Sequence, residues 1–173
     1  MRFARRLYRD ESGAMAIEFA LVVMPFITLL FGIIGVGLYF LTMFNLDGSI
    51  ERASRVLRTG EVQKGNWDQA RYKRYVCDNL IGSFNCDDLQ VNVRNFPTGT
   101  ALNAATLPSC LDDGGNLSAA SDYYPGTDDS FVLVWICYEW KMAASIPFLK
   151  LGTMNNGSAI IQAATAFRTE NFQ

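Results

Sequence analysis

A single carboxylate stands at the head of a long apolar segment. Glu18 follows a leader with four arginines, and it is the last charged residue before a charge-free run that spans residues 19–46. An ionised carboxylate in hydrocarbon is costly, so such a residue commonly has an ion-pairing function. The pattern therefore predicts an acid that pairs with a cation near a membrane face. The alternative is a carboxylate that only extends to the lipid headgroups.

Four cysteines follow the apolar segment, and none precedes it. They are Cys77, Cys86, Cys110 and Cys137. A zinc site is a poor interpretation, because the chain has no Cys-x-x-Cys and no histidine. Four cysteines allow three disulfide pairings. Short-range closure favours Cys77–Cys86, which leaves Cys110–Cys137 as the second pair.

The other polar residues give little support for catalysis. The absence of histidine excludes Ser-His-Asp and Cys-His triads and removes the commonest general base. Glu139 has no second carboxylate at a useful spacing, and the aspartates of residues 98–130 match no EF-hand loop. We therefore expect no enzyme, no cofactor and no metal. The slightly negative net charge and the lack of a basic stripe after Arg58 argue against a nucleic-acid partner.

The apolar segment is long enough to cross a bilayer. Residues 19–44 form a run of 26 residues without charge, and a crossing helix needs about 20. A buried helix of a soluble protein is rarely apolar on every face. A cleaved secretory signal has a shorter apolar region that ends at a small-x-small site. Residues 35–37 only weakly resemble such a site and lie inside the run, so we expect the span to be retained.

The leader and the cysteines predict the orientation of this span. Four arginines precede it and three follow it closely, so the charge asymmetry alone is modest. All four cysteines lie beyond it, and disulfides form in oxidising compartments rather than in the cytosol. We expect the leader in the cytoplasm and the remainder of the chain outside.

Two helices are predicted around the end of the span. The first continues past a break or wobble at Gly48 and stops at Gly60, with an apolar face at helical spacing. The second covers about residues 67–81 and begins with Asn66 as its N-cap.

The rest of the chain predicts a small sheet. Residues 89–96 alternate as a half-buried strand, and residues 131–140 are β-branched and aromatic enough for a central strand. Residues 160–169 form the last strand, and residues 98–130 form a long loop pinned by Cys110. The expected fold is α+β: a long N-terminal transmembrane helix continues into a domain in which a helix packs on a small, about three-stranded antiparallel sheet.

The leader and the first part of the span resemble a known class of signal. They are similar to the class III signal of type IV pilins and pseudopilins, in which glutamate stands at the fifth position of the mature chain. Residues 5–26 look like the start of a TadE-like protein, and residues 161–172 more weakly resemble the closing strand of that family. The leader is short, and Phe19 stands where major Flp pilins usually have tyrosine.

The resemblance implies residue roles at the start of the chain. A prepilin peptidase would cut between Gly13 and Ala14, and Glu18, with Phe19 beside it, would set assembly and register. The new α-amine of Ala14 would be mostly cationic at neutral pH, about 6 Å along the axis from Glu18. Glu18 would then neutralise this amine or the amine of a neighbouring subunit. Pro25 lacks a backbone N–H and is expected to kink or loosen the helix.

The resemblance also implies a function and partners. It implies a minor pilin or pseudopilin that takes part in Tad (Flp) pilus assembly, in the initiation or tip complex, because the major pilins are much shorter. The implied partners are inner-membrane lipid, the prepilin peptidase, other minor pilins, the major Flp pilin and the pilus assembly platform proteins. The implied location is the bacterial inner membrane, single-pass, with a cytoplasmic N-terminus and a periplasmic C-terminal domain, and the extracellular pilus after incorporation.

The chain then divides into three expected parts. Residues 1–13 are a cytoplasmic basic leader that is cleaved, residues 14–60 are the transmembrane helix with its periplasmic extension, and residues 61–173 are a disulfide-stabilised periplasmic α+β domain. A signal-anchored periplasmic binding domain is one alternative. A tip adhesin that uses Trp67, Tyr123 and Tyr124 is another.

Overall fold

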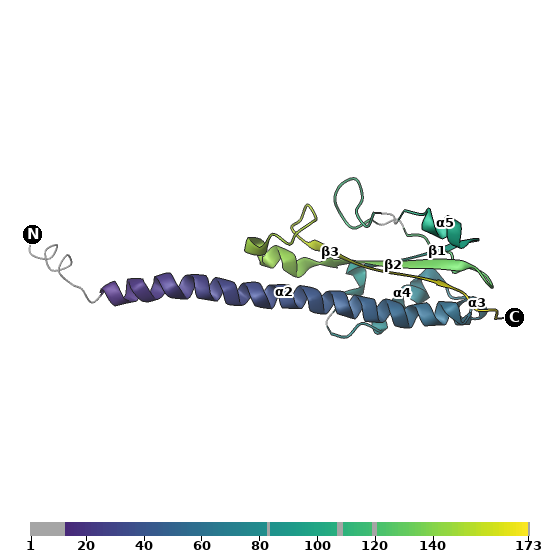
Figure 1. Ribbon diagram of the computed structural model, residues 1–173, viewed down its shortest axis with the longest axis horizontal. Helices are drawn as coiled ribbons and strands as arrows, with labels where there is room; N and C mark the ends of the chain where they lie inside the picture. Colours follow the sequence, from purple (N-terminus) through teal and green to yellow (C-terminus); the bar gives the residue numbers. More distant parts are fainter. Residues whose placement is uncertain (1–12, 83, 107–108, 119–120, 173) are drawn as a thin grey trace, which may run out of the picture. The chain divides into compact units, whose positions relative to one another are not determined.

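A computed structural model describes residues 13–82, 84–106, 109–118 and 121–172 of the chain (Figure 1). The chain forms two compact units. The first unit ends at Leu38, and the second covers residues 39–173. One continuous helix, α2 (Ala14–Arg58), contributes residues to both units.

In the first unit, α2 is a helix with exposed apolar side chains. Phe19, Leu29 and Ile33 are each more than half exposed, as are most large hydrophobic residues of this stretch. The helix continues through Pro25. In the next turn the Thr28 hydroxyl donates a hydrogen bond to the Met24 carbonyl at 2.9 Å. The helix is long and apolar enough to cross a membrane.

In the second unit, α2 places one apolar face in the core. The buried members of this face are Leu46, Ile50, Ala53, Val56 and Leu57. The sequence predicted a break or wobble at Gly48, but the helix continues through it. The packing of the buried face outweighs the roughly 1 kcal/mol that a glycine costs inside a helix. The helix ends at Arg58, and Gly60 follows with a φ of 77°, in agreement with the predicted stop.

Two helices follow α2 in the chain, α3 (Glu61–Lys64) and α4 (Gln69–Asp78). The prediction that Asn66 caps the second helix is wrong. The N-cap is Asp68, whose carboxylate accepts a hydrogen bond from the backbone N–H of Arg71 at 2.8 Å. Asn66 lies in the preceding turn with a φ of 45°, a left-handed conformation that asparagine tolerates better than most residues.

Buried hydroxyl groups fix α4 on α2. The Ser49 hydroxyl donates to the carbonyl of Val76 at 2.7 Å, and the Tyr72 hydroxyl donates to the carbonyl of Ala53 at 3.1 Å. Both side chains belong to residues that are fully buried. Because a buried hydroxyl without a partner is costly, these two bonds fix the register between the helices.

The sheet contains three antiparallel strands, β1 (Leu89–Phe96), β2 (Phe131–Trp140) and β3 (Ala159–Arg168), in the order β1-β2-β3. The central position predicted for β2 is confirmed, and β3 begins one residue before its predicted start. One row across the sheet pairs Leu89 with Tyr138 and Tyr138 with Ile161. Together with the apolar helix, this layout confirms the α+β fold class.

The second face of the sheet is covered by the long loop between β1 and β2. The sequence predicted a half-buried β1, but its polar residues Gln90 and Asn92 are also buried. The cause is the disulfide from Cys110 to Cys137, which packs with Trp135 in a buried cluster on that face. The alternation of apolar and polar residues along β1 indicates that one face of the strand is buried. It cannot show that a loop from a distant part of the chain covers the other face.

Further short helical segments lie outside these helices and strands. They are η2 (Cys86–Asp88), α5 (Gly99–Asn103), η3 (Lys141–Ser145) and η4 (Pro147–Leu149), and of these α5 lies in the predicted loop. The loop after α5 also reaches the edge of β1. There the N–H of Val93 donates to the carbonyl of Asp122 at 2.8 Å, and the N–H of Tyr124 donates to the carbonyl of Val93 at 2.9 Å.

Candidate functional site

The candidate processing site lies at the beginning of α2. Gly13 is exposed and directly precedes the helix, whose first residue is Ala14. Glu18 is exposed one helical turn later, and Phe19 beside it is 69% exposed. Residues four positions apart lie on the same face of a helix. A chain that began at Ala14 would therefore carry its α-amine on the face that carries Glu18.

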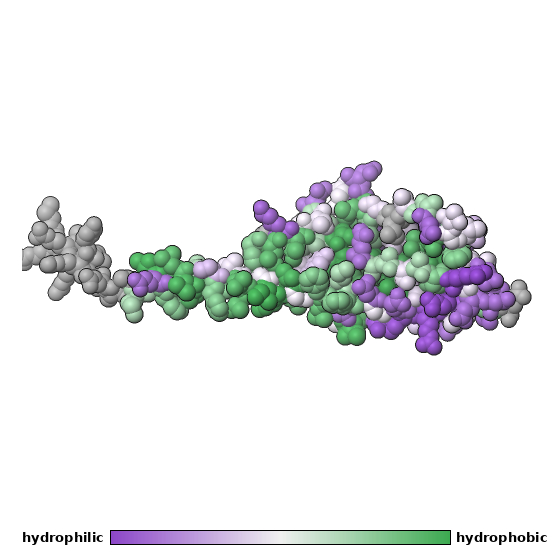
Figure 2. All heavy atoms as spheres, viewed as in Figure 1, coloured by the Kyte–Doolittle hydropathy of each residue, from purple (hydrophilic) through white to green (hydrophobic). Residues whose placement is uncertain are grey.

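The remainder of α2 in the first unit presents apolar side chains without a partner surface. Figure 2 shows this part of the helix as a predominantly hydrophobic surface. Almost none of its most apolar stretch is buried. Exposed apolar area of this extent marks a surface that lipid or another protein covers. Gly32, Gly35 and Gly37 in the same stretch would permit close approach of a neighbouring helix.

Two disulfides constrain the second unit. Cys77 bonds to Cys86 with 5.9 Å between the Cα atoms, and Cys110 bonds to Cys137 with 5.8 Å. This is the pairing that the sequence favoured. The first bond closes a short segment after α4, whereas the second ties the long loop to the central strand. The second bond is also the more deeply buried, since Cys110 and Cys137 are 1% and 0% exposed.

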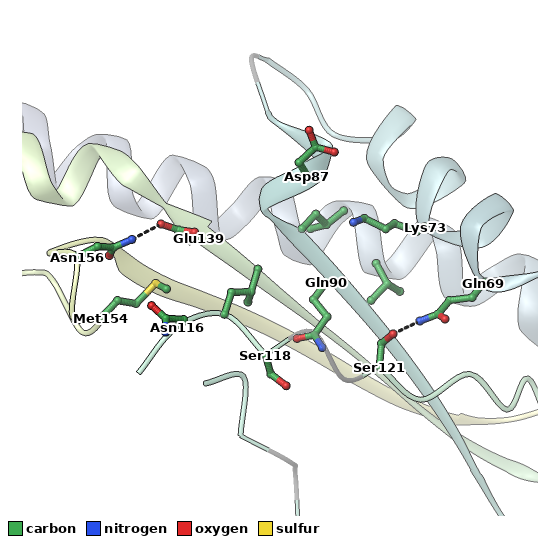
Figure 3. A pocket seen from close by; sticks show the side chains of 13 residues that line it. Gln69, Lys73, Asp87, Gln90, Asn116, Ser118, Ser121, Glu139, Met154 and Asn156 are labelled. Carbon is green, nitrogen blue, oxygen red and sulfur yellow. Dashed lines mark hydrogen bonds between the residues drawn. The ribbon is translucent and has the colours of Figure 1, made fainter. Parts of the chain in front are cut away.

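A cavity of about 420 Å³ lies between α4, the start of β1 and the covering loop (Figure 3). The Glu139 carboxylate accepts a hydrogen bond from the Asn156 amide at 2.8 Å, and the Gln69 amide donates to the Ser121 hydroxyl. Asp87 is the other acidic residue of the lining, and Figure 3 shows it well apart from Glu139. The lining therefore lacks the paired carboxylates that general acid–base catalysis would use.

The comparison with protein families matches the start of the chain. A family model described as TadE-like protein covers residues 13–55. Residues 13–55 are therefore similar to a TadE-like protein. The resemblance inferred from Gly13, Ala14 and Glu18 is confirmed for this segment. No curated protein and no solved structure matches the chain.

Three of the aspartates in the loop of residues 98–130 have structural partners. Asp122 forms an ion pair with Arg94, and Asp129 forms a longer one with Arg168 at 3.4 Å. The Asp112 carboxylate accepts the backbone N–H of Asn116 at 2.9 Å. Within the part of the chain that the structure describes, no three acidic, cysteine or histidine side chains gather as a metal site.

Two of the three aromatic residues considered for adhesion are partly buried in the second unit. The ring of Trp67 contacts that of Tyr75 in a tilted arrangement, with the centroids 5.4 Å apart, and lies beneath the guanidinium of Arg71. The Tyr123 hydroxyl donates to the backbone carbonyl of Trp67 at 3.0 Å. Tyr124 remains 59% exposed. A single exposed tyrosine is an ordinary surface feature, so the arrangement does not favour the adhesin alternative.

Two buried tyrosines predict a loss of stability at alkaline pH. Burial, with a smaller effect of the Asp68 charge, raises the pKa of Tyr123 to about 12, and burial raises the pKa of Tyr72 well above its ordinary value. An unfolded tyrosine ionises near pH 10, so the unfolded chain loses these protons first. The free energy of unfolding should therefore be constant below about pH 10 and fall by up to about 1.4 kcal/mol per pH unit for each tyrosine above it.

Urea unfolding of the detergent-solubilised chain at a series of pH values measures this slope. Tyr123→Phe is the matched control, because it removes one of the tyrosines whose pKa burial raises, and it should reduce the slope above pH 10. The substitution also removes the hydrogen bond to Trp67, so the comparison uses the slope rather than the absolute stability. A stability that stays flat to about pH 12 in the unchanged chain would contradict the prediction.

Some contacts of the second unit were not predicted from the sequence. The Lys141 amine donates to the Asp88 carboxylate at 2.6 Å, and this hydrogen bond raises the pKa of Lys141. The rings of Tyr39 and Trp140 meet edge to face with their centroids 5.7 Å apart. The position of Tyr39 near the end of the apolar run could have singled out this residue, because tyrosine is common at membrane interfaces.

Proposed function

We propose that this protein is a minor pilin or pseudopilin that takes part in assembly of the Tad (Flp) pilus, in the initiation or tip complex. The observation that carries the proposal is the start of α2. A small-residue junction at Gly13 and Ala14 directly precedes an exposed apolar helix, and Glu18 stands one turn inside it. The TadE-like match covers the same residues.

The proposed location is the bacterial inner membrane, with one span. The leader lies in the cytoplasm, α2 crosses the bilayer, and the second unit lies in the periplasm. Support comes from the two disulfides of that unit, which persist in oxidising compartments. Incorporation into the pilus would later move the same unit to the cell exterior.

The proposed assembly step is an exchange of lipid for protein around α2. The prepilin peptidase removes residues 1–13 and exposes the α-amine of Ala14. Glu18 pairs with that amine, or with the amine of a neighbouring subunit, while Phe19 and the apolar side chains leave lipid and enter the filament. An ion pair in a low-dielectric bundle discriminates against a subunit in the wrong axial register, because a charge without its partner is costly there.

The size of the part that follows the span supports a minor rather than a major subunit. The chain continues through residues 61–173 as a disulfide-bonded α+β part, whereas major pilins of this system have almost no globular domain. Such a part suits a subunit that initiates or terminates the filament. Its proposed partners are other minor pilins, the major Flp pilin and the platform proteins, besides the peptidase and membrane lipid.

Processing is tested by the N-terminal residue and intact mass of the protein recovered from membranes without reductant. With an active prepilin peptidase, we expect a chain that begins at Ala14. Its mass should be lower than that of the reduced chain by four hydrogen atoms, because it contains two disulfides. Gly13→Val is the matched control, because a β-branched side chain replaces the small residue at the cut, and this variant should retain Met1.

The other outcomes would reject parts of the proposal. A chain that still begins at Met1 beside an active peptidase would be a plain signal-anchored protein. A chain that begins after residue 46 would be a secreted domain, and the cavity beside Glu139 would then become the place to look for a binding function.

A further inference from the structure

One end of the second unit carries a band of exposed apolar side chains. Phe40, Leu41 and Phe44 on α2 are 50%, 58% and 69% exposed. Met142 on η3 and Phe148 on η4 are 44% and 51% exposed. These residues come from two parts of the chain that are about 100 positions apart, and the contact between the rings of Tyr39 and Trp140 joins the two parts.

The segment from residue 141 to residue 150, here called the foot, is anchored at its beginning. Trp140 precedes it and contacts the ring of Tyr39 edge to face. Ala143 within the foot is 2% exposed, and the amine of Lys141 bonds to the carboxylate of Asp88 at 2.6 Å. Met142 and Phe148 are therefore exposed on a segment whose beginning is anchored to Asp88 and, through Trp140, to Tyr39 of α2.

The length of the apolar helix before Tyr39 is enough to cross the hydrocarbon core of a bilayer. Residues 19–38 are 20 residues of apolar helix, and 20 residues at 1.5 Å each span about 30 Å, the thickness of the hydrocarbon core. Tyr39 is the next residue of the same helix. Tyrosine and tryptophan are enriched at this level of a bilayer, where the ring is apolar and its polar atom reaches water. The Tyr39–Trp140 pair therefore has the composition and position of an interfacial anchor.

The charges of the foot also suit a lipid surface. Lys141 and Lys150 bracket the exposed Met142 and Phe148, and both lysines are exposed. Lysine at such a position extends its amine to headgroup phosphates while its methylene chain covers apolar surface. The two acidic groups that act on Lys141 have hydrogen-bond partners, since Asp88 bonds to Lys141 itself and Glu139 accepts the Asn156 amide.

We propose that the foot is a lipid-binding element that rests in the interface of the same membrane that α2 crosses. Met142 and Phe148 enter the boundary between headgroups and acyl chains, and Lys150 contacts anionic headgroups, while Lys141 keeps its bond to Asp88. The inference rests on the membrane insertion of α2 proposed above. A second contact besides α2 prevents the second unit from tilting and turning freely, which fixes the face that it presents to an incoming subunit.

Depth-dependent quenching in vesicles tests the foot. The oxidised full chain carries one additional cysteine, either Phe148→Cys or the control Tyr124→Cys, labelled with an environment-sensitive fluorophore. Each variant is reconstituted at low protein-to-lipid ratio into vesicles of phosphatidylethanolamine and phosphatidylglycerol. The control position is matched, because Tyr124 and Phe148 are 59% and 51% exposed. Spin-labelled lipid should quench about half of the emission at position 148 and almost none at position 124.

A charge variant provides an independent measurement. Lys150→Glu in the labelled Phe148→Cys chain should reduce the quenching about twofold in anionic vesicles and leave it unchanged in vesicles of phosphatidylcholine alone. Flotation of the vesicles after alkaline extraction reports the insertion of α2 separately from the contact of the foot.

The outcomes separate the two proposals. Flotation without quenching at position 148 would overturn the lipid contact and leave the membrane anchor intact. A change in emission at position 148 that grows with the protein-to-lipid ratio, and not with the amount of spin-labelled lipid, would identify a contact between subunits. This outcome would also overturn the lipid contact. Loss of flotation would reject the membrane anchor and the lipid contact together.

Discussion

Replacing Cys110 and Cys137 together by alanine should lower the free energy of unfolding by about 3–4 kcal/mol. The bond closes a segment with a sequence separation of 27, and the chain-entropy estimate for a loop of this length gives about 3.6 kcal/mol. Both sulfur atoms belong to buried residues that pack with Trp135, so their loss also loosens the cluster. Alanine is preferred to serine here, because serine would bury an additional hydroxyl.

The matched control is the double replacement of Cys77 and Cys86 by alanine. That bond has a sequence separation of 9, for which the same estimate gives about 2.7 kcal/mol, and Cys86 is exposed. Urea unfolding of each oxidised chain measures the two losses. Hydrogen exchange should show that only the first variant opens the second face of the sheet, with faster exchange at Gln90 and Asn92. Equal stability of the first variant and the unchanged chain would contradict the expected result.

The elements that the sequence predicted correctly are those whose signals lie within the element. β2 is β-branched and aromatic along its whole length, and it occupies the centre of the sheet. Gly60 adopts the left-handed conformation that a helix stop requires, and a side chain there would collide with the ring of Phe172. The short separation of Cys77 and Cys86 made their pairing the simplest closure, and the structure has it.

The features that the sequence did not predict depend on contacts between distant residues. Burial of Gln90 and Asn92 requires the loop that Cys110 ties to β2, and alternation in β1 carries no sign of it. The continuous helix at Gly48 depends on packing against the sheet and α4, which local propensity cannot report. Asn66 and Asp68 are both good N-cap residues, so composition alone could not choose between them.

The candidate site divides in the same way. The processing junction and Glu18 are a linear pattern, and residues 13–55 match a family model on that pattern. No local sequence pattern predicts the foot. Lys141, Met142 and Phe148 become a surface only because Trp140 packs on Tyr39, a contact across about 100 residues of sequence.

Glu18→Gln should leave processing and membrane insertion unchanged and reduce incorporation into pili about tenfold or more. Glutamine keeps the size of the side chain and removes its charge, so the α-amine of Ala14 enters the low-dielectric filament without a partner. The measurements are the N-terminal residue, the amount in the membrane fraction, and the amount in sheared pili. Glu51→Gln is the matched control, because it makes the same change at an exposed carboxylate further along α2 and should leave all three unchanged.

Glu18→Asp tests whether incorporation into pili depends on the negative charge at this position alone or also on the length of the side chain. Aspartate keeps the negative charge on a side chain that is one methylene shorter. If an ion pair sets the axial register, the aspartate variant should incorporate at a level between those of the unchanged chain and Glu18→Gln. If the glutamate only extends to the headgroups, all three chains should form pili equally, since none of them then depends on a charge inside the filament. Normal piliation by Glu18→Gln would therefore reject the proposed register contact while leaving the membrane anchor and the processing site untouched.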